Sequence, residues 1–305
     1  MKRIDIGSSG LCASAIGIGC MRITDMNVKE LAVLVDKALS LDIDLFDHAD
    51  IYGGGEAERL FGRLFAETPS LRGKMVLQSK CGIRDGWYDL SKEHIMQSTE
   101  GILKRLGTDY LDLLMLHRPD TLMEPEQIAE AFDELYTSGK VRRFGVSNMN
   151  PAQIELLQTY VGKRLIVNQL QFSAAHSGMV DSGIHVNVPD EMGSSRDGSV
   201  LEYCRTKRIT IQTWSSLQYG FFAGTFLNNE KYPALNAVLT ELALKYECTE
   251  AAVAIAWILR HPAGMQAIVG STNPKRIEEI AAAGRITLER KEWYDIYKAA
   301  GNQLP

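Results

Sequence analysis

Short apolar segments alternate with helical segments along nearly the whole chain, and this alternation restricts the possible fold more than any single motif. Each apolar segment is short and continuous, as expected for strands whose two faces are both covered. Between them, apolar side chains recur at helical spacing, as at Leu31, Leu34, Val35 and Ala38. The predicted strands are residues 16–19, 45–47, 75–80, 111–117, 144–147, 165–169, 209–214 and 266–269.

Eight strand–helix units in 305 residues predict an α/β fold, the (β/α)8 or TIM barrel, with residues 1–305 forming one domain. Two extended pieces around 7–10 predict an N-terminal β-hairpin, and extra helices near 234–246 and 289–300 are expected toward the C-terminus. The alternative is a doubly wound open sheet, which needs a glycine-rich turn after a strand. Its best candidate, residues 17–22, lacks the third glycine, so the barrel is favoured.

Residues 173–199 interrupt the alternation. The segment is rich in Gly, Ser, Asp and Pro, and we expect a long loop insertion. It follows the carboxyl end of a predicted strand, which in a barrel is the catalytic face. Two interpretations remain open, a mobile surface insertion and a lid or latch over a bound cofactor.

Composition argues against several classes of partner. The net charge is −5 and no block of Lys or Arg occurs, so neither nucleic acid nor an anionic membrane is an expected partner. Five cysteines without zinc-like Cys/His spacing predict reduced thiols, a cytoplasmic location and no metal site. The first residues lack the apolar core of a signal peptide, and the longest apolar segment, 251–259, is too short to span a bilayer.

The predicted strands deliver polar or aromatic side chains at their carboxyl ends. In a (β/α)8 barrel these ends meet at one face, where the active site lies. One polar strand end means little, but a series of them predicts a functional site. Tyr52 joins the series, because it follows the second strand by five residues and precedes three glycines. The strand-end residues are Asp47, Lys80, His117, Ser147, Gln169, Trp214 and Ser271.

These residue types suit a proton donor aimed at a carbonyl group. A phenol has a pKa near 10, and a neighbouring ammonium group is expected to lower that of Tyr52. A carboxylate such as Asp47 would keep Lys80 charged and in place, and His117 could orient a carbonyl oxygen. No side chain supplies a hydride ion, so a cofactor is implied.

The set resembles the active site of the aldo-keto reductases, which are NAD(P)H-dependent barrels with an Asp–Tyr–Lys–His tetrad. The matching residues are Asp47, Tyr52, Lys80 and His117, and similar motifs occur at 116–120, 139–148 and 270–277. The resemblance covers essentially the whole chain and implies that the hairpin closes the bottom of the barrel. Residues 47–53 and 293–301 most resemble a bacterial subgroup, the YdhF-like oxidoreductases.

The resemblance implies an enzyme that reduces an aldehyde or ketone to an alcohol with NADPH. Tyr52 would donate the proton, Lys80 and Asp47 would tune it, and His117 would orient the carbonyl. Arg276 would bind the 2′-phosphate of NADPH, and Trp214 would stack on the nicotinamide. The other expected cofactor contacts are Ser147, Asn148, Gln169, Ser215, Leu217, Gly220, Ser271, Thr272, Asn273 and Glu279.

Two positions depart from the family's pattern. His48 stands where the family often has Ser or Thr, and its role is left open. Ile280 stands where the family often has Asn, which removes one expected contact to the adenine ring and leaves the strictness of the NADPH preference open.

The substrate is expected to be a small carbonyl compound bound by a monomer or a weak homo-oligomer. The loops after the strands would line its pocket, and their aromatic residues favour apolar aldehydes while their arginines admit anionic ones. The candidate pocket residues are Met21, Arg22, Arg84, Trp87, Tyr88, Arg118, Phe221 and Phe222.

Two other functional classes remain as alternatives. In a Schiff-base lyase Lys80 would be a nucleophile and would have to be uncharged. The second alternative is a non-catalytic protein that senses a cofactor, although the complete tetrad argues against this class.

Overall fold

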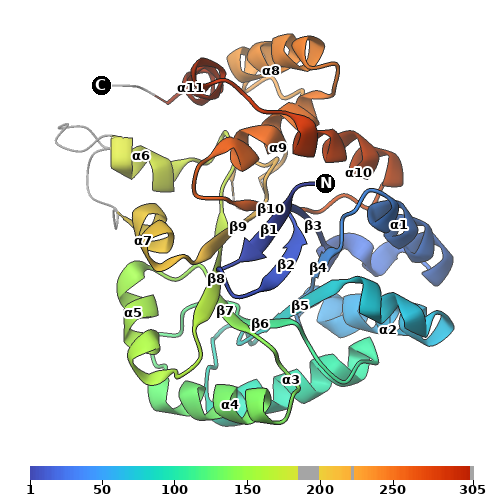
Figure 1. Cartoon of the computed structure of the whole chain (residues 1–305), viewed down its shortest axis with the longest axis vertical. Coiled ribbons are helices and arrows are strands. Elements are labelled where there is room, and N and C mark those ends of the chain that lie inside the picture. Colours follow the sequence, from blue (N-terminus) through green and yellow to red (C-terminus); the bar gives the residue numbers. More distant parts are fainter. Residues whose placement is uncertain (185–198, 221–222, 303–305) are drawn as a thin grey trace.

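The computed structural model describes residues 1–184, 199–220 and 223–302, and it confirms the barrel. Eight parallel strands close on themselves in the order β10-β3-β4-β5-β6-β7-β8-β9 (Figure 1). Each predicted strand is present, with ends that differ by at most two residues. The strands are β3 (Ile16–Gly19), β4 (Leu45–Asp47), β5 (Val76–Cys81), β6 (Leu113–Leu116), β7 (Phe144–Ser147), β8 (Leu165–Gln171), β9 (Thr210–Trp214) and β10 (Gln266–Val269).

Helices surround the barrel, and local sequence signals set several of their ends. Asn27 and Asn150 cap the first turns of α1 and α5 in capping boxes, and Ser91 caps α3 as the sequence predicted. The helices are α1 (Val28–Ser40), α2 (Glu56–Glu67), α3 (Lys92–Leu106), α4 (Pro125–Thr137), α5 (Pro151–Tyr160), α6 (Gly178–Ile184), α7 (Val200–Lys207), α8 (Pro233–Lys245), α9 (Glu250–Arg260), α10 (Pro274–Ala281) and α11 (Arg290–Ala299). Short 3-10 helices are η1 (Cys20–Asp25), η2 (Tyr52–Gly55), η3 (Pro69–Lys74) and η4 (Ala282–Arg285).

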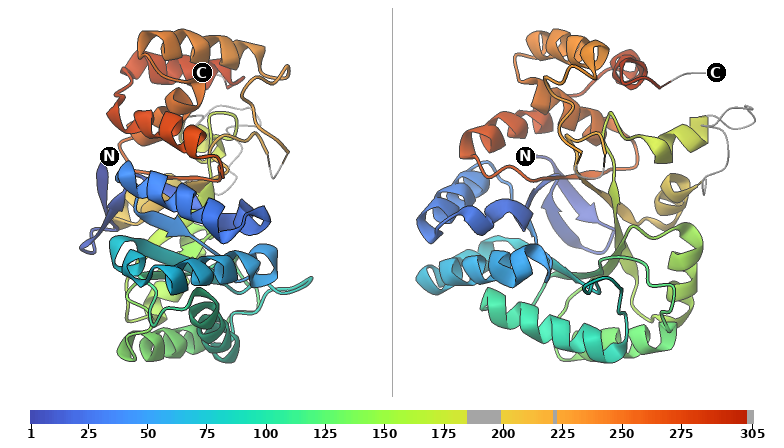
Figure 2. Two further views of the ribbon diagram at one scale, coloured as in Figure 1. Left: turned by 90° about the vertical axis from the view of Figure 1, so that its right-hand side faces the viewer. Right: turned by 180° about the vertical axis from the view of Figure 1, so that it is seen from behind.

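The predicted hairpin is present and lies across one end of the barrel. It consists of β1 (Arg3–Ile6) and β2 (Leu11–Ser14), which pair antiparallel. Ile6 and Ala13 are fully buried and belong to a cluster that includes Leu45 and Val76 from the start of the barrel strands. The hairpin therefore closes the bottom, as seen at the centre of Figure 1, and the right panel of Figure 2 shows the opposite side.

The interior of the barrel changes from apolar to polar along the strands. Successive side chains of a strand point to opposite faces, so β5 presents Val76, Gln78 and Lys80 to the same side. Val76 packs in the apolar cluster under the hairpin, whereas Gln78 and Lys80 make buried hydrogen bonds. The polar half lies toward the carboxyl ends of the strands, where the sequence placed the site.

The prediction that 173–199 is a long loop was wrong for part of that segment. Residues Gly178–Ile184 form helix α6, which is joined to the C-terminal helix α11. Tyr297 donates its hydroxyl to Asp181 at 2.7 Å, and Asn302 donates its amide to Ser177 at 2.9 Å. These partners, more than a hundred residues away in sequence, explain why local composition misled the prediction. The rest of the segment, 185–198, lies outside the described residues.

In the described part of the chain, no helix is both long enough and apolar enough to cross a bilayer.

Gly62 provides a test of how closely α2 and α3 pack. A Cβ atom at this position would lie 2.1 Å from the backbone oxygen of Arg105, so Gly62→Ala must push the two helices apart. We expect it to lower the free energy of unfolding by about 1–3 kcal/mol, measured by denaturant titration. Gly73→Ala is the control, because nothing lies within 4 Å of its Cβ position. Equal effects of the two substitutions would contradict the close approach.

Candidate active site

The structure brings three of the four tetrad residues into direct hydrogen-bond contact. Lys80 is fully buried, and its Nζ donates to Asp47 Oδ2 at 2.9 Å and to the Tyr52 hydroxyl at 3.0 Å. A third bond runs to the backbone oxygen of His48 at 2.8 Å. The ammonium therefore lies between the carboxylate and the phenol, as the sequence predicted.

The charges around Lys80 oppose the cost of burying it. Burial alone would lower its pKa, but Asp47 and Tyr52 raise the pKa above the ordinary value, so the side chain is an ammonium at neutral pH. Lys80 lowers the pKa of Tyr52, as expected, but the net shift of that pKa is upward. Burial of the phenol raises that pKa, and the opposing effect of Lys80 does not cancel it. Tyr52 is thus a fully protonated phenol at neutral pH.

His117 follows β6 and faces Tyr52. The two rings meet edge to face, with their centroids 6.0 Å apart. Burial, helped by the charges of Lys80 and Arg118, holds the pKa of His117 well below its usual range. The ring is therefore a neutral imidazole that can donate one hydrogen bond. Its Nδ1 is buried and has no hydrogen-bond partner within the described structure.

His48 contributes through its backbone rather than its ring. The ring is fully buried, lies edge-on to Phe61 with centroids 4.8 Å apart, and has no hydrogen-bond partner for either nitrogen among the described residues. Burial, with the charge of Lys80, lowers its pKa to about 3, so it stays neutral. Its backbone oxygen is the group that accepts from Lys80.

The residues expected around the nicotinamide form a connected set beside the tetrad. The indole nitrogen of Trp214 donates to Asn148 Oδ1 at 3.2 Å, and Asn148 donates its amide to Ser147 Oγ at 2.7 Å. Ser147 in turn donates to the backbone oxygen of Gln169 at 2.9 Å. These contacts fix the orientation of the Asn148 amide before any ligand binds.

The remaining predicted cofactor residues lie on two segments after β9 and β10. Ser215 donates to Gln218 at 2.7 Å at the start of the first segment, which also contains Leu217 and Gly220. The second leads into α10, where Asn273 accepts from the backbone of Arg276 at 3.4 Å as the N-cap. In this second segment the side chains of Asn273 and Arg276 are exposed, and the partly exposed residues are Ser271, Thr272 and Glu279.

Ile280 lies on the inner side of α10 and is 3% exposed. It packs in the main core, so its side chain is not available to an adenine ring.

The predicted substrate residues lie on loops at the carboxyl ends of the strands. Trp87 and Tyr88 are 55% and 44% exposed, and the Arg84 guanidinium lies 5.3 Å from the Trp87 ring. Arg118 lies 5.9 Å from the ring of Trp214. Met21 is 37% exposed, at the start of η1. Phe221 and Phe222 lie outside the described residues.

A buried ion pair behind the tetrad was missed from the sequence. Glu58 of α2 is fully buried and accepts from Ser79 Oγ at 2.7 Å and from Arg105 Nε at 2.7 Å. Its spacing from Phe61 and Phe65 places it on the apolar face of α2, which is the signal that could have revealed it. Burial, then the charge of Glu58, raises the pKa of nearby Asp50 to about 7.

A second missed feature is a set of glutamines inside the barrel. Gln78, Gln212 and Gln266 are all fully buried on strands β5, β9 and β10. Their positions on predicted strands were visible in the sequence, but an isolated glutamine in a strand is ordinary.

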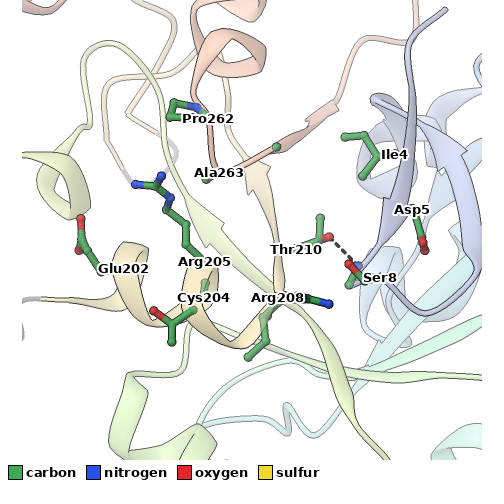
Figure 3. Close-up of a pocket in the computed structure, with 14 residues that line it drawn as sticks. Ile4, Asp5, Ser8, Glu202, Cys204, Arg205, Arg208, Thr210, Pro262 and Ala263 are labelled. Atoms are coloured by element: carbon green, nitrogen blue, oxygen red, sulfur yellow. Dashed lines mark hydrogen bonds between the residues drawn. The ribbon is translucent and has the colours of Figure 1, made fainter.

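A cavity of about 640 Å³ lies at the other end of the barrel (Figure 3). Its walls include Asp5 and Ser8 of the hairpin, Arg205 and Arg208 around the end of α7, and Pro262 before β10. None of the predicted site residues lines it, so it is separate from the tetrad.

Comparisons with known proteins agree with this geometry. A family model described as the aldo/keto reductase family matches residues 15–300. Over the full length of both proteins, the chain is 37% identical to the uncharacterized oxidoreductase YcsN of Bacillus subtilis and 34% identical to the oxidoreductase YdhF of Escherichia coli. It is also 34% identical to a 6-dehydroglucose reductase of Agrobacterium fabrum, with 98% of each protein covered.

Solved structures show the same fold. The thermostable aldo-keto reductase Tm1743, in complex with the inhibitor epalrestat, superimposes with a TM-score of 0.79 at 24% identity and covers 98% of this chain and 100% of that one. From the family model and the full-length relatives together, we conclude that the chain is an oxidoreductase that belongs to the aldo/keto reductase family.

Proposed function

We propose that residues 1–305 act as one catalytic domain that reduces an aldehyde or ketone to an alcohol with NADPH. The observation that carries the proposal is the position of the Lys80 ammonium, within hydrogen-bond distance of both Asp47 and the Tyr52 hydroxyl. A hydride must come from a bound dihydronicotinamide, because side chains cannot supply one.

Tyr52 is the proposed proton donor. As the carbonyl carbon accepts a hydride, the electron pair of the double bond moves to the oxygen, which takes the proton of the phenol. Lys80, 3.0 Å from the phenol oxygen, stabilises the phenolate that is left. Neutral His117 can donate a hydrogen bond to the same carbonyl oxygen and fix its direction.

The residues beside the tetrad fit a nicotinamide carboxamide. Ser147 and Asn148 offer hydroxyl and amide groups whose orientations are already fixed by hydrogen bonds to each other and to Trp214. For the nucleotide end, Arg276 is exposed at the first turn of α10 and makes no side-chain ion pair within the described part of the chain. An unpaired guanidinium beside a helix N-terminus suits a phosphate group, which supports NADPH rather than NADH.

For the substrate, we propose a small polar aldehyde, with an oxidised sugar as the first candidate. Two relatives, 34% and 32% identical, are named 6-dehydroglucose reductases. The exposed rings of Trp87 and Tyr88 offer flat apolar surfaces, and the exposed guanidinium of Arg84 beside Trp87 carries hydrogen-bond donors. This combination suits a molecule that has both a ring face and hydroxyl groups.

The alternatives are less well supported. A Schiff-base lyase needs an uncharged lysine, whereas Asp47 and Tyr52 raise the pKa of Lys80. A protein that only senses a cofactor would have no need for a phenol, an ammonium and an imidazole directed at one point. Trapping of a substrate adduct on Lys80 with borohydride would favour the lyase instead.

Tyr52→Phe tests the proton donor. Removal of the hydroxyl is expected to lower kcat for carbonyl reduction by about 10²–10⁴-fold, the usual contribution of general acid catalysis. NADPH binding, measured by the quenching of protein fluorescence, should be unchanged because the ring remains. A variant that retains wild-type turnover would exclude Tyr52 as the donor.

The pH dependence of the hydride-transfer rate is a second test. The pKa of His117 is lowered from 6.5 and that of Tyr52 is raised from 10.0, so neither group changes its charge between these values. We expect a flat single-turnover rate across this range. Asp50→Asn is the control, because Asp50, with a pKa of about 7, is a nearby group that titrates there. An inflection that persists in this variant would show that a tetrad residue titrates near neutral pH.

Arg276→Met tests the choice of cofactor. Loss of a charge-assisted bond to the 2′-phosphate is expected to raise KM for NADPH about ten- to hundredfold. KM for NADH should change little. Arg285→Met, at an exposed arginine on η4, is the matched control and should leave both values unchanged. An equal rise for both cofactors would argue against phosphate recognition by Arg276.

A further inference from the structure

We propose that three buried glutamines, Gln78, Gln212 and Gln266, are positioning residues for the catalytic pair Asp47 and Lys80. Together with Gln169 they form a continuous series of amide hydrogen bonds inside the barrel, which we call the amide chain. The proposal rests on the proposed carbonyl reduction, because it concerns the geometry of the residues that perform it.

The amide chain runs from the catalytic carboxylate to the bottom of the barrel. Gln78 Nε2 donates to Asp47 Oδ1 at 2.6 Å and to Gln212 Oε1 at 2.9 Å. Gln212 Nε2 donates back to Gln78 Oε1 at 2.9 Å and onward to Gln266 Oε1 at 2.8 Å. Gln266 then donates to the backbone oxygen of Ser14, at the end of hairpin strand β2, at 2.5 Å.

Gln169 makes a second connection between Asp47 and the amide chain. Its Nε2 donates to Asp47 Oδ1 and to Gln212 Oε1, both at 3.2 Å. Both amide hydrogens of Gln169 are therefore used inside the barrel. A bound nicotinamide carboxamide would meet its acceptor, Oε1, which suits the NH2 group of that carboxamide.

The charge of Asp47 determines how every amide in the chain is oriented. A carboxylate can only accept hydrogen bonds, so Gln78 must present its NH2 group to it. The oxygen of the Gln78 amide, Oε1, then faces Gln212, so Gln212 must present its NH2 group to it. The NH2 group of Gln212 also reaches Gln266, so Gln266 must present its Oε1. If one amide turned over, two oxygens or two NH2 groups would face each other in a buried space. The orientation is thus fixed cooperatively along the whole chain.

Ordinary core packing does not account for these residues. The interior of a (β/α)8 barrel is usually filled by branched apolar side chains, as it is below, where Leu45, Val76 and Leu113 pack under the hairpin. Burying an amide is costly unless its hydrogen bonds are made. The four amides are joined to one another by hydrogen bonds, and two of them donate directly to Asp47.

The consequence for catalysis is a carboxylate that cannot rotate. Asp47 Oδ1 accepts hydrogen bonds from the amides of Gln78 and Gln169. It also lies 2.8 Å from Lys80 Nζ, and Oδ2 accepts a hydrogen bond from Lys80 at 2.9 Å. Rotation of the carboxylate would break these contacts together. Lys80 is therefore held where it reaches the Tyr52 hydroxyl, and the amide chain acts on the proton donor through Asp47 and Lys80.

The test compares Gln78→Met, Gln212→Met and the double variant with the wild-type enzyme. Methionine has a similar size and shape but no hydrogen-bonding amide. For Gln78→Met we expect the single-turnover hydride-transfer rate to fall about ten- to hundredfold, the effect of losing a hydrogen bond to a charged group. KM for NADPH should stay close to the wild-type value. Gln212→Met should reduce the rate less, because it does not contact Asp47.

The double variant separates catalysis from stability. Gln78→Met alone leaves the Gln212 amide without its partner, so Tm should fall. Replacing both partners removes the mismatch between them, although Gln266 Oε1 then lacks the donor of Gln212, so Tm should partly recover only relative to the sum of the two single losses. The hydride-transfer rate should not recover, since Asp47 still lacks the donor of Gln78. A rate that recovers together with Tm would overturn the proposal, as would wild-type kinetics in folded Gln78→Met.

Asn168→Leu is the matched control. Asn168 is a fully buried amide on β8 that donates to the backbone oxygen of Met149 at 2.9 Å and makes no hydrogen bond to Asp47 in the described structure. Loss of the Asn168 amide should lower Tm and leave the hydride-transfer rate unchanged.

If the wild-type protein reduced no carbonyl compound with NADPH, the proposed function would fail. If it did so and Gln78→Met and Gln212→Met reacted at its rate, only the role of the amide chain would fail.

Discussion

The buried ammonium of Lys80 is the group on which the rest of the site depends. A charge inside a barrel is tolerated only when its hydrogen bonds are all made. Lys80 has three N–H donors, and they reach Asp47, the backbone oxygen of His48 and the Tyr52 hydroxyl. These acceptors come from β4, the turn after it and η2. The requirement to surround one ammonium therefore positions three consecutive pieces of chain against β5.

The backbone reinforces this arrangement beyond the end of β4. His48 and Asp50 donate their N–H groups to the backbone oxygens of Gln78 and Lys80, both on β5. The short strand β4 is thus continued by hydrogen bonds as far as the turn that carries Tyr52. On the outer side of β5, Ser79 donates to buried Glu58, which pairs with Arg105. β5 is therefore held on both of its faces by buried polar contacts.

Much of this arrangement could be predicted from the sequence. The spacing of apolar residues identifies the strands and helices, and the position of a polar residue at a strand end identifies the face of the barrel on which it lies. The strand ends place Asp47, Lys80 and His117 on one face of the barrel whatever the details of packing. The direction of the shift in the pKa of Tyr52 could not be predicted, since it depends on the balance of burial against the charge of Lys80. Helix α6 was missed because its partners on and just after α11, Tyr297 and Asn302, lie far away in sequence.

The amide chain was missed for a different physical reason. A glutamine on a strand gives no sign of its partners until the barrel closes and brings β5, β8, β9 and β10 around one axis. Once they meet, each amide is satisfied only by the next, and Asp47 supplies the fixed orientation at one end. The buried polar residues of the barrel therefore both fill its interior and hold the catalytic carboxylate in position. A substitution at Gln212, which touches no tetrad residue, changes what Gln78 can donate, and so reaches the carboxylate that holds Lys80 in place.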